Sequence, residues 1–418
     1  MGIVKLTNEQ FNEFIIKHGY NSIYQTPEYN NTMKNQRLES LLLGLEKDGN
    51  IIGASAILIS TKRGFKYAYA SRGFLLDYNN EESVKIFTDE IKKYLSKLDV
   101  VAIKLSPMII KNIYNANKEL IYHNEDYNKI YLYLKSLDYY HFGYNNYFES
   151  LKPRFEAVLD ISKPYYKTFN NIKKNFRTKI RNADKMGVKI YKGDINNIQD
   201  LYIHTKRKYP RDEFYFADIY NNFGSKAEIF YTKLDTKKYL IECQKNYQTQ
   251  DALNAKLDNE ILINVNNNDK LINKKMIADK LLSHFRNQLV NATNLLKEHP
   301  EGIITASALI VINQDTVYLY MDGYDKKYHH LNSKHLLLWK LIERYSGLGY
   351  KKFNLGGVIS IFSSNEKYNG LNEFKLNFNP DVIEYLGDLE LICNNTLYFM
   401  YRNSFPFNPF IKKNTRVN

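Results

Sequence analysis

The sequence predicts a duplicated α+β fold whose second half is interrupted by a helical hairpin. Three observations lead to this prediction. The chain has 418 residues, which is too long for one hydrophobic core and indicates two or three domains. Both halves show the same predicted order of elements, namely strand, hairpin, helix and strand, although no sequence repeat is detectable. Residues 237–300 interrupt this order in the second half with a polar segment whose apolar residues recur at helical spacing.

The first half begins with two helices and continues with strands. Asn8 can cap a helix over residues 8–19, in which apolar residues recur at helical spacing. Thr26 and Pro27 supply the cap and the first residue of a second helix. A short turn at residues 47–50 predicts a hairpin. The remaining elements are predicted as strands at 40–45, 51–60 and 66–70, a helix at 81–97 and a buried strand at 100–105.

The second half repeats this order from about residue 155. Its basic helix is predicted to run from Tyr165 to Met186 and to end at Gly187. A hairpin is expected around residues 313–315. The other predicted elements are strands at 155–159, 188–191, 226–233, 302–312, 316–322 and 352–355, and helices at 195–209 and 332–346.

Residues 237–300 are expected to form an antiparallel helical hairpin that projects from the globule. Two apolar, helically spaced arms flank the polar link at 264–269. A pair of helices packed on the domain is the alternative. The expected domains are residues 1–152 together with about 386–418, and residues 153–385, with the arm inserted in the second.

Composition indicates an anionic partner and a reducing compartment. The formal net charge is +14, and such an excess favours nucleic acid, phosphorylated metabolites or an anionic membrane surface. General use of lysine explains part of it. Cys243 and Cys393 lie far apart and have no metal-ligand spacing. The N-terminus lacks a signal-peptide core and no run is long enough to span a bilayer, so we expect a soluble, cytoplasmic protein.

Several common catalytic motifs are absent from the sequence. It contains no phosphate-binding loop, no dinucleotide-binding glycine fingerprint, no HExxH and no CxxC. Histidines 329, 330 and 335 cluster without an accompanying carboxylate pattern. We therefore expect no metal and no cofactor.

Two features indicate chemistry with anionic substrates. Lys174, Arg177 and Arg181 share one face of the basic helix, which suits phosphates, although a solvated basic face is the alternative. Lys375 lies between apolar neighbours after a glycine-rich turn. It is either a partly buried cation aimed into a cleft or an edge-strand lysine in water.

Tyrosines and a charged pair form a weaker pattern. Tyr318 and Tyr320 face one side of a strand, and Tyr324 follows just past its expected end. They predict a sugar or peptide platform or, equally, core packing. Arg211-Asp212 predicts a ligand clamp or a loop-shaping ion pair.

Short motifs distributed over nearly the whole chain resemble one family in their order and spacing. They are Gln25-Thr26-Pro27-Glu28-Tyr29 with Lys34, Tyr69 with Arg72-Gly73, Pro153-Arg154, Phe176-Arg177 to Ala183, Arg211-Asp212 with Phe214, Tyr320 with Gly323, Leu337 with Trp339, Gly356-Gly357, and Gly370-Leu371 with Phe374-Lys375. The chain thus resembles the Fem-type peptidoglycan-bridge aminoacyltransferases, and its insertion resembles the helical arm of one subgroup.

The resemblance implies two acetyltransferase-like (GNAT) domains, with the C-terminal tail returning to the first. It implies an aminoacyl-tRNA donor and, as acceptor, an amine on the stem peptide of lipid II or UDP-MurNAc-pentapeptide, with at most peripheral contact with the cytoplasmic membrane face. The lysine matching Lys375 is implicated in catalysis, and we expect Phe374 to exclude water beside it. The residue matching Lys34 contacts precursor phosphates. Other candidate substrate-binding residues are Tyr69, Arg72, Arg211, Tyr320, Gly356 and Gly357 from the matching motifs, and Tyr324 from the tyrosine face. The candidate tRNA-binding residues are Lys174, Arg177 and Arg181 of the basic helix.

Three positions depart from the family pattern. Asn354 and Ser106 stand where many members have aspartate, and Ala217 stands where relatives often place a second arginine. The phosphate clamp then needs another cation, Arg211 or Arg72. The alternatives are a coenzyme-A-dependent N-acyltransferase of the same fold, whose pyrophosphate loop is missing here, and a non-catalytic RNA-binding protein.

Overall fold

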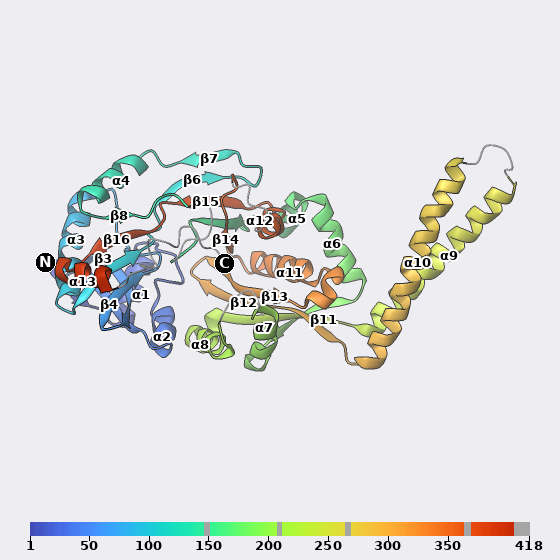
Figure 1. The fold of residues 1–418 in the computed structure, drawn as a ribbon, viewed down its shortest axis with the longest axis horizontal. Coiled ribbons are helices and arrows are strands. Elements are labelled where there is room, and N and C mark those ends of the chain that lie inside the picture. Colours follow the sequence, from blue (N-terminus) through green and yellow to red (C-terminus); the bar gives the residue numbers. More distant parts are fainter. Residues whose placement is uncertain (146–150, 207–210, 264–268, 363–368, 405–418) are drawn as a thin grey trace.

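The computed structural model describes residues 1–418 except 146–150, 207–210, 264–268, 363–368 and 405–418. It contains two β-sheets, of seven and nine strands, with helices packed around them. A pair of long helices projects from one end (Figure 1). The α+β class with two sheets and an inserted helical hairpin is therefore confirmed.

The seven-stranded sheet is built mainly from the first part of the chain. Its order is β1 (Gly2–Lys5), β2 (Glu39–Lys47), β3 (Asn50–Lys62), β4 (Phe65–Ala70), β5 (Val100–Leu105), β16 (Leu389–Ile392) and β8 (Tyr140–His141). Its helices are α1 (Asn8–Lys17), α2 (Pro27–Asn35), α3 (Glu81–Ser96), α4 (Tyr127–Ser136) and α13 (Asn395–Ser404). The α2 helix begins as predicted, because the Thr26 hydroxyl accepts from the Tyr29 N–H and Pro27 has no N–H that would need an acceptor.

The nine-stranded sheet holds most of the second part of the chain. Its order is β10 (Val188–Gly193), β11 (Ala227–Leu234), β12 (Ile303–Asn313), β13 (Thr316–Tyr324), β14 (Lys352–Val358), β9 (Phe155–Asp160), β15 (Asp381–Tyr385), β6 (Ile110–Tyr114) and β7 (Leu120–His123). Its α-helices are α5 (Tyr165–Asn171), α6 (Lys174–Lys185), α7 (Ile198–Thr205), α8 (Glu213–Phe223), α11 (Ser333–Gly347) and α12 (Asn369–Leu376). Short 3₁₀ turns are η1 (Ile195–Asn197), η2 (Gly224–Lys226) and η3 (Lys326–Leu331).

Both sheets repeat one topology, which confirms the predicted duplication. In each, a first strand is followed by two α-helices, three antiparallel strands, one α-helix and a fifth strand that runs parallel to the fourth. The second copy uses β10 to β14 in the same roles. The predicted boundary at residue 152 does not separate the sheets, since β6 and β7 precede it yet join the nine-stranded sheet.

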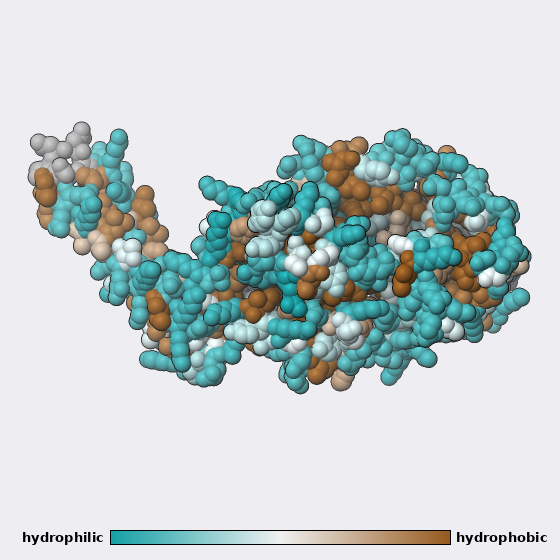
Figure 2. All heavy atoms as spheres, turned by 180° about the vertical axis from the view of Figure 1, so that it is seen from behind, coloured by the Kyte–Doolittle hydropathy of each residue, from teal (hydrophilic) through white to brown (hydrophobic). Residues whose placement is uncertain are grey.

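The inserted arm consists of α9 (Thr236–Ile263) and α10 (Asp269–Glu298), which follow β11 and precede β12 in the sequence. The two helices pack against each other along their length. It extends away from the sheets, so the alternative of helices packed on the domain is wrong (Figure 1). Leu257, Ala278 and Ala292 are buried along the arm. Figure 2 shows apolar groups among the polar surface of the arm, and the exposed ones include Leu262, Ile263, Ile272, Met276 and Ile277.

Two local predictions are wrong. The basic helix does not run unbroken from Tyr165, because Ile172 and Lys173 adopt extended backbone angles and divide it into α5 and α6. The predicted helix over 195–209 is limited to η1 and α7, and its residues 207–210 lie outside the described part. Among the described residues, no helix has the length and apolarity that a bilayer crossing requires.

Candidate active site

Lys375 is a buried cation rather than a surface lysine. It lies near the end of α12 and is 9% exposed, so the alternative of an edge-strand lysine in water is wrong. Its ammonium donates a hydrogen bond to the Gly357 carbonyl over 2.7 Å. Phe374 packs against the rings of Phe176, His335 and Phe378, so the apolar side of α12 anchors the lysine.

The approach of Lys375 to the strand depends on a break in β14. The parallel pairing of β13 with β14 covers only the residues from Thr316 to Tyr318, and the register of β14 against β9 shifts between Asn354 and Gly357. Gly356 has φ of +79°, a conformation that favours glycine, and a Cβ there would lie 3.6 Å from the Lys375 Nζ. The double glycine thus lets the backbone turn beside the cation.

Asn354 holds this turn through both ends of its amide. Its Oδ1 accepts from the Gly356 N–H over 2.7 Å, and its Nδ2 donates to Glu156 Oε2 over 2.9 Å. An aspartate at this position could make only the first of these bonds while Glu156 is ionised. The departure from the family pattern therefore has a structural partner in Glu156.

Glu156 also pairs with Arg72, at the boundary between the two sheets. Arg72 is 3% exposed and its Nη2 donates to Glu156 Oε1 over 2.6 Å and to the Pro153 carbonyl over 2.7 Å. Burial opposes ionisation of Glu156, but Arg72 and the Asn354 amide outweigh it and lower its pKa. Arg72, which the resemblance predicts as a substrate-binding residue, thus lies buried in an ion pair within the protein.

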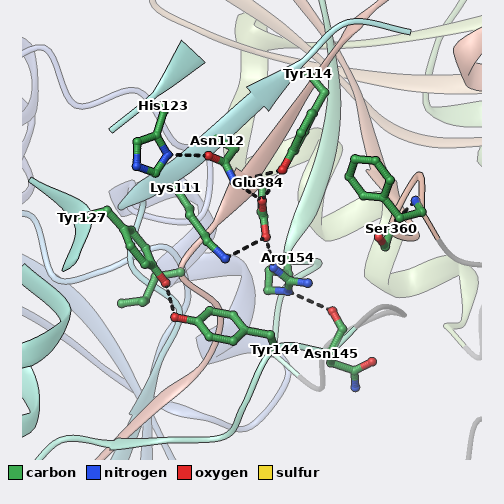
Figure 3. A network of polar contacts seen from close by, with 12 residues as sticks. Lys111, Asn112, Tyr114, His123, Tyr127, Tyr144, Asn145, Arg154, Ser360 and Glu384 are labelled. Atoms are coloured by element: carbon green, nitrogen blue, oxygen red, sulfur yellow. Dashed lines mark hydrogen bonds and ion pairs between the residues drawn. The ribbon is translucent and has the colours of Figure 1, made fainter. Parts of the chain in front are cut away.

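A second buried ion pair joins segments that are distant in sequence (Figure 3). Arg154 pairs with Glu384 of β15, and the Glu384 carboxylate also accepts from Asn112 of β6 over 2.7 Å. Lys111 adds a longer contact of 3.7 Å to the same carboxylate. Arg154, a residue of the family-like motif just before β9, is thus linked through Glu384 of β15 to Asn112 of β6 within the nine-stranded sheet.

Aromatic residues from both parts of the chain form one cluster around α2 and α8, which pack together. The Tyr320 hydroxyl is hydrogen-bonded to that of Tyr215, and the Arg211 guanidinium lies 4.6 Å above the Tyr215 ring centroid. Arg211 is exposed, whereas Tyr69 is half-buried at the edge of the cluster. Lys34 is exposed in the last turn of α2. The structure therefore brings Arg211 and Tyr320 together, with Lys34 on the neighbouring helix.

The basic helix residues lie apart from this cluster. Lys174 and Arg181 are exposed on α6, Arg177 is half-buried, and Arg181 lies over the ring of Phe169. The α6 helix packs on α11, so its basic residues lie on the α11 side of the molecule. Tyr324 ends β13 and lines a cavity together with Phe374.

Sequence reasoning missed Lys152 and Glu156. The Lys152 ammonium lies 3.2 Å from the Tyr24 ring centroid, and burial followed by the charges of Arg72 and Arg211 lowers its pKa to about 7. Its only sequence signal was its position next to the Pro153-Arg154 motif. Within the described residues, no group of three His, Cys, Asp or Glu side chains could hold a metal ion.

Comparison with known proteins shows the family. A model of the FemAB family matches residues 6–403. Aminoacyltransferase FemA of Staphylococcus epidermidis is 25% identical over 417 residues, covering 96% of this chain and 98% of that protein. Aminoacyltransferase FemA of Staphylococcus aureus (strain bovine RF122 / ET3-1) is 24% identical, covering 96% and 97%. The crystal structure of FemX has the same fold, with a TM-score of 0.71, 22% identity and coverage of 96% and 99%.

Proposed function

The chain belongs to the FemAB family, and on that premise we propose that it transfers an aminoacyl group from aminoacyl-tRNA to a stem-peptide amine of a peptidoglycan precursor. The curated relatives are named aminoacyltransferases and align with this chain over nearly its whole length. The acceptor is lipid II or UDP-MurNAc-pentapeptide. The product extends the interpeptide bridge of the cell wall.

The buried ammonium of Lys375 is the observation that supports this chemistry most directly. The donor is an ester and is already activated, so transfer needs no covalent enzyme intermediate. The acceptor nitrogen attacks the ester carbonyl, the new C–N bond forms, and the C–O bond to the ribose breaks. Negative charge develops on the carbonyl oxygen and then on the ribose oxygen, which takes up a proton. A preorganised cation stabilises this charge.

The surrounding residues position two anionic substrates. We assign Phe374 to exclude water beside Lys375, because its ring is held by three neighbouring rings. Arg211, Tyr320 and Lys34 are assigned to the precursor, with the two cations on its phosphates. Gly356 and Gly357 are assigned to keep the backbone turned beside the Lys375 ammonium. Tyr69 is assigned to the edge of the aromatic cluster that contains Tyr320. Lys174, Arg177 and Arg181 are assigned to the tRNA backbone.

The test is the variant Lys375→Met, assayed for transfer from a panel of aminoacyl-tRNAs to both precursors. We expect turnover to fall by about 10²- to 10³-fold, the usual loss for one electrostatic contact to the developing oxyanion, with little change in precursor binding. Lys340→Met is the matched control, because Lys340 pairs with Glu343 on the far part of α11. Turnover like that of the wild type in Lys375→Met would remove the lysine from the mechanism. Acetyl-CoA consumption, or RNA retention without transfer, would contradict the proposed function.

A further inference from the structure

The ammonium of Lys152 is not used by any assignment made above. Lys152 directly precedes the Pro153-Arg154 motif but is not itself a motif residue. Its Nζ lies 3.2 Å from the ring centroid of Tyr24 and 5.7 Å from that of Tyr29. Within the described residues, this half-buried ammonium makes neither an ion pair nor a hydrogen bond. An ammonium carries three donors, so Lys152 can still bind an anionic ligand.

The charges around Lys152 also favour an anion. Burial, followed by the charge of Arg72 and later that of Arg211, lowers the pKa of Lys152 to about 7. Two carboxylates act in the opposite direction, but both are already engaged. Glu156 binds Arg72 over 2.6 Å, and Asp388 pairs over 2.8 Å with a buried lysine of β5. A ligand that brings negative charge to Lys152 would therefore relieve the repulsion between three neighbouring cations.

Lys152 lies in the aromatic cluster to which the precursor is assigned. The rings of Tyr24 and Tyr29 meet edge to face, with centroids 5.1 Å apart, and Tyr29 belongs to α2, the helix that carries Lys34. The other wall is α8, which packs on α2 and whose Tyr215 lies under the Arg211 guanidinium. Lys152 and Arg211 thus reach this cluster from two different segments of the chain.

We propose that Lys152 and Arg211 together bind the pyrophosphate of the acceptor, with Lys152 held in place on the ring of Tyr24. The inference rests on the proposed function and adds a residue to its acceptor site. Lipid II and UDP-MurNAc-pentapeptide both carry a pyrophosphate, whose two adjacent negative charges suit two neighbouring cations. The precursor is favoured over RNA because the basic residues assigned to RNA lie on α6, apart from this cluster.

Acceptor binding should then take up a proton on Lys152. Near pH 7 the ammonium of the free protein is half deprotonated, and a bound pyrophosphate stabilises the charged form. The protonated fraction of the free protein falls from about one half at pH 7 to about one tenth at pH 8, so affinity should fall about fivefold over this interval. Tyr24 and Tyr29 face the same ammonium, but their hydroxyls stay protonated in this range.

The first test is isothermal titration calorimetry with UDP-MurNAc-pentapeptide and, separately, with a short-chain lipid II analogue. Lys152→Met and Lys152→Arg are compared with wild type after circular dichroism has confirmed folding. Loss of one bond to a charged group corresponds to about a tenfold change, so Lys152→Met should bind about tenfold more weakly at pH 7. Lys152→Arg keeps its charge at every pH, so it should retain affinity and lose the fall between pH 7 and pH 8.

The second test measures the proton directly. Titrations at pH 8 in two buffers of different ionisation enthalpy give the number of protons taken up per precursor. Wild type should take up about 0.9 proton more than Lys152→Arg, the deprotonated fraction expected at that pH. Lys135→Met is the matched control, because it removes an exposed lysine that lies 5.6 Å from the Tyr131 ring centroid on α4.

Kinetics distinguish a binding role from a structural one. Lys152→Met should raise KM for the precursor and leave kcat at saturating precursor and KM for aminoacyl-tRNA unchanged. Affinity like that of wild type in Lys152→Met, or an equal loss in Lys152→Met and Lys152→Arg, would overturn the assignment of Lys152. A rise in KM for aminoacyl-tRNA alone would assign the lysine to the donor and also overturn it.

Equal proton uptake by wild type and Lys152→Arg would overturn the coupling to protonation. Absence of transfer by wild type from every charged tRNA would refute the proposed function instead. The calorimetric titrations need no turnover, so they would still decide whether Lys152 binds a pyrophosphate.

Discussion

Replacing Glu156 by glutamine tests whether the two sheets are held in place by a buried carboxylate. The carboxylate binds Arg72 with one oxygen and Asn354 with the other. Glutamine keeps the size but supplies one acceptor and one donor. Whichever way its amide faces, a donor meets the guanidinium or the Asn354 amide, whose own oxygen is committed to the Gly356 N–H.

The magnitude follows from burial. Arg72 is 3% exposed, and among the described residues its guanidinium would keep the Pro153 carbonyl and the Tyr385 ring as partners. Leaving one member of a buried ion pair without its counter-charge costs about 3–5 kcal/mol. We therefore expect Glu156→Gln to lower the free energy of unfolding by about 4 kcal/mol at neutral pH. Because the folded-state pKa of Glu156 is lowered, its contribution is present above pH 4.5 and is lost as pH falls through the lowered pKa.

Equilibrium unfolding in urea, followed by tryptophan fluorescence, measures this loss. The single tryptophan, Trp339, is buried in α11 and reports on the part of the molecule that contains Asn354. A double-mutant cycle with Arg72→Met should show a coupling of about 2–4 kcal/mol. Glu28→Gln is the control, since its pair with the half-exposed Lys226 should contribute less than about 1 kcal/mol. A loss below about 1 kcal/mol in Glu156→Gln, or an additive cycle, would refute the reasoning.

Three further predictions follow from the same geometry. Gly356→Ala should lower stability by about 1–2 kcal/mol, because its φ is +79°, and strain in the turn that faces Lys375 should also lower turnover. An unchanged melting temperature and kcat would contradict this. The folded-state pKa of Lys152, about 7, lies below its unfolded value, so Lys152 should make the wild-type free energy of unfolding rise from pH 7 towards pH 10. Urea titrations at several pH values should show a flatter rise in Lys152→Met. Equal profiles would argue against a buried Lys152 ammonium. The free energy of unfolding should fall as pH drops from 6.5 to 4, because the pKa of folded His335 is lowered and the unfolded chain takes up the proton first. The same titrations on His335→Phe should show a smaller fall. An identical fall would contradict the lowered pKa of His335.

Local signals were enough to predict most elements. Thr26 and Pro27 mark the start of α2, Gln314 lies at the turn between β12 and β13, and the arm is visible from its spacing alone. In each case the residues that determine the element are neighbours in sequence. The order of the motifs was enough to predict the family, because order survives when pairwise identity is low.

Contacts between residues that are far apart in sequence could not be predicted in the same way. Nothing near Arg72 indicates that Glu156 neutralises it, since the two residues are 84 positions apart. The assignment of β6 to the second sheet depends on its pairing with β15, which comes much later in the chain. The α12 helix was missed because its periodic residues are few and its stability comes from packing of Phe374 on α6 and α11. The pairing of Arg72 with Glu156 and the α12 helix are thus determined by contacts that sequence pattern does not encode.

The return of the chain to the first sheet has a consequence for synthesis on the ribosome. β16 pairs with both β5 and β8, yet it is the last strand in chain order that the structure describes. Until it emerges, the β5 edge has no partner on that side and β8 has no place in the sheet. β15, just before it, likewise inserts between β9 and β6 of the other sheet. Neither sheet can therefore be completed until β15 and β16 have left the ribosome. Because these two strands emerge one directly after the other, both sheets are completed at almost the same time.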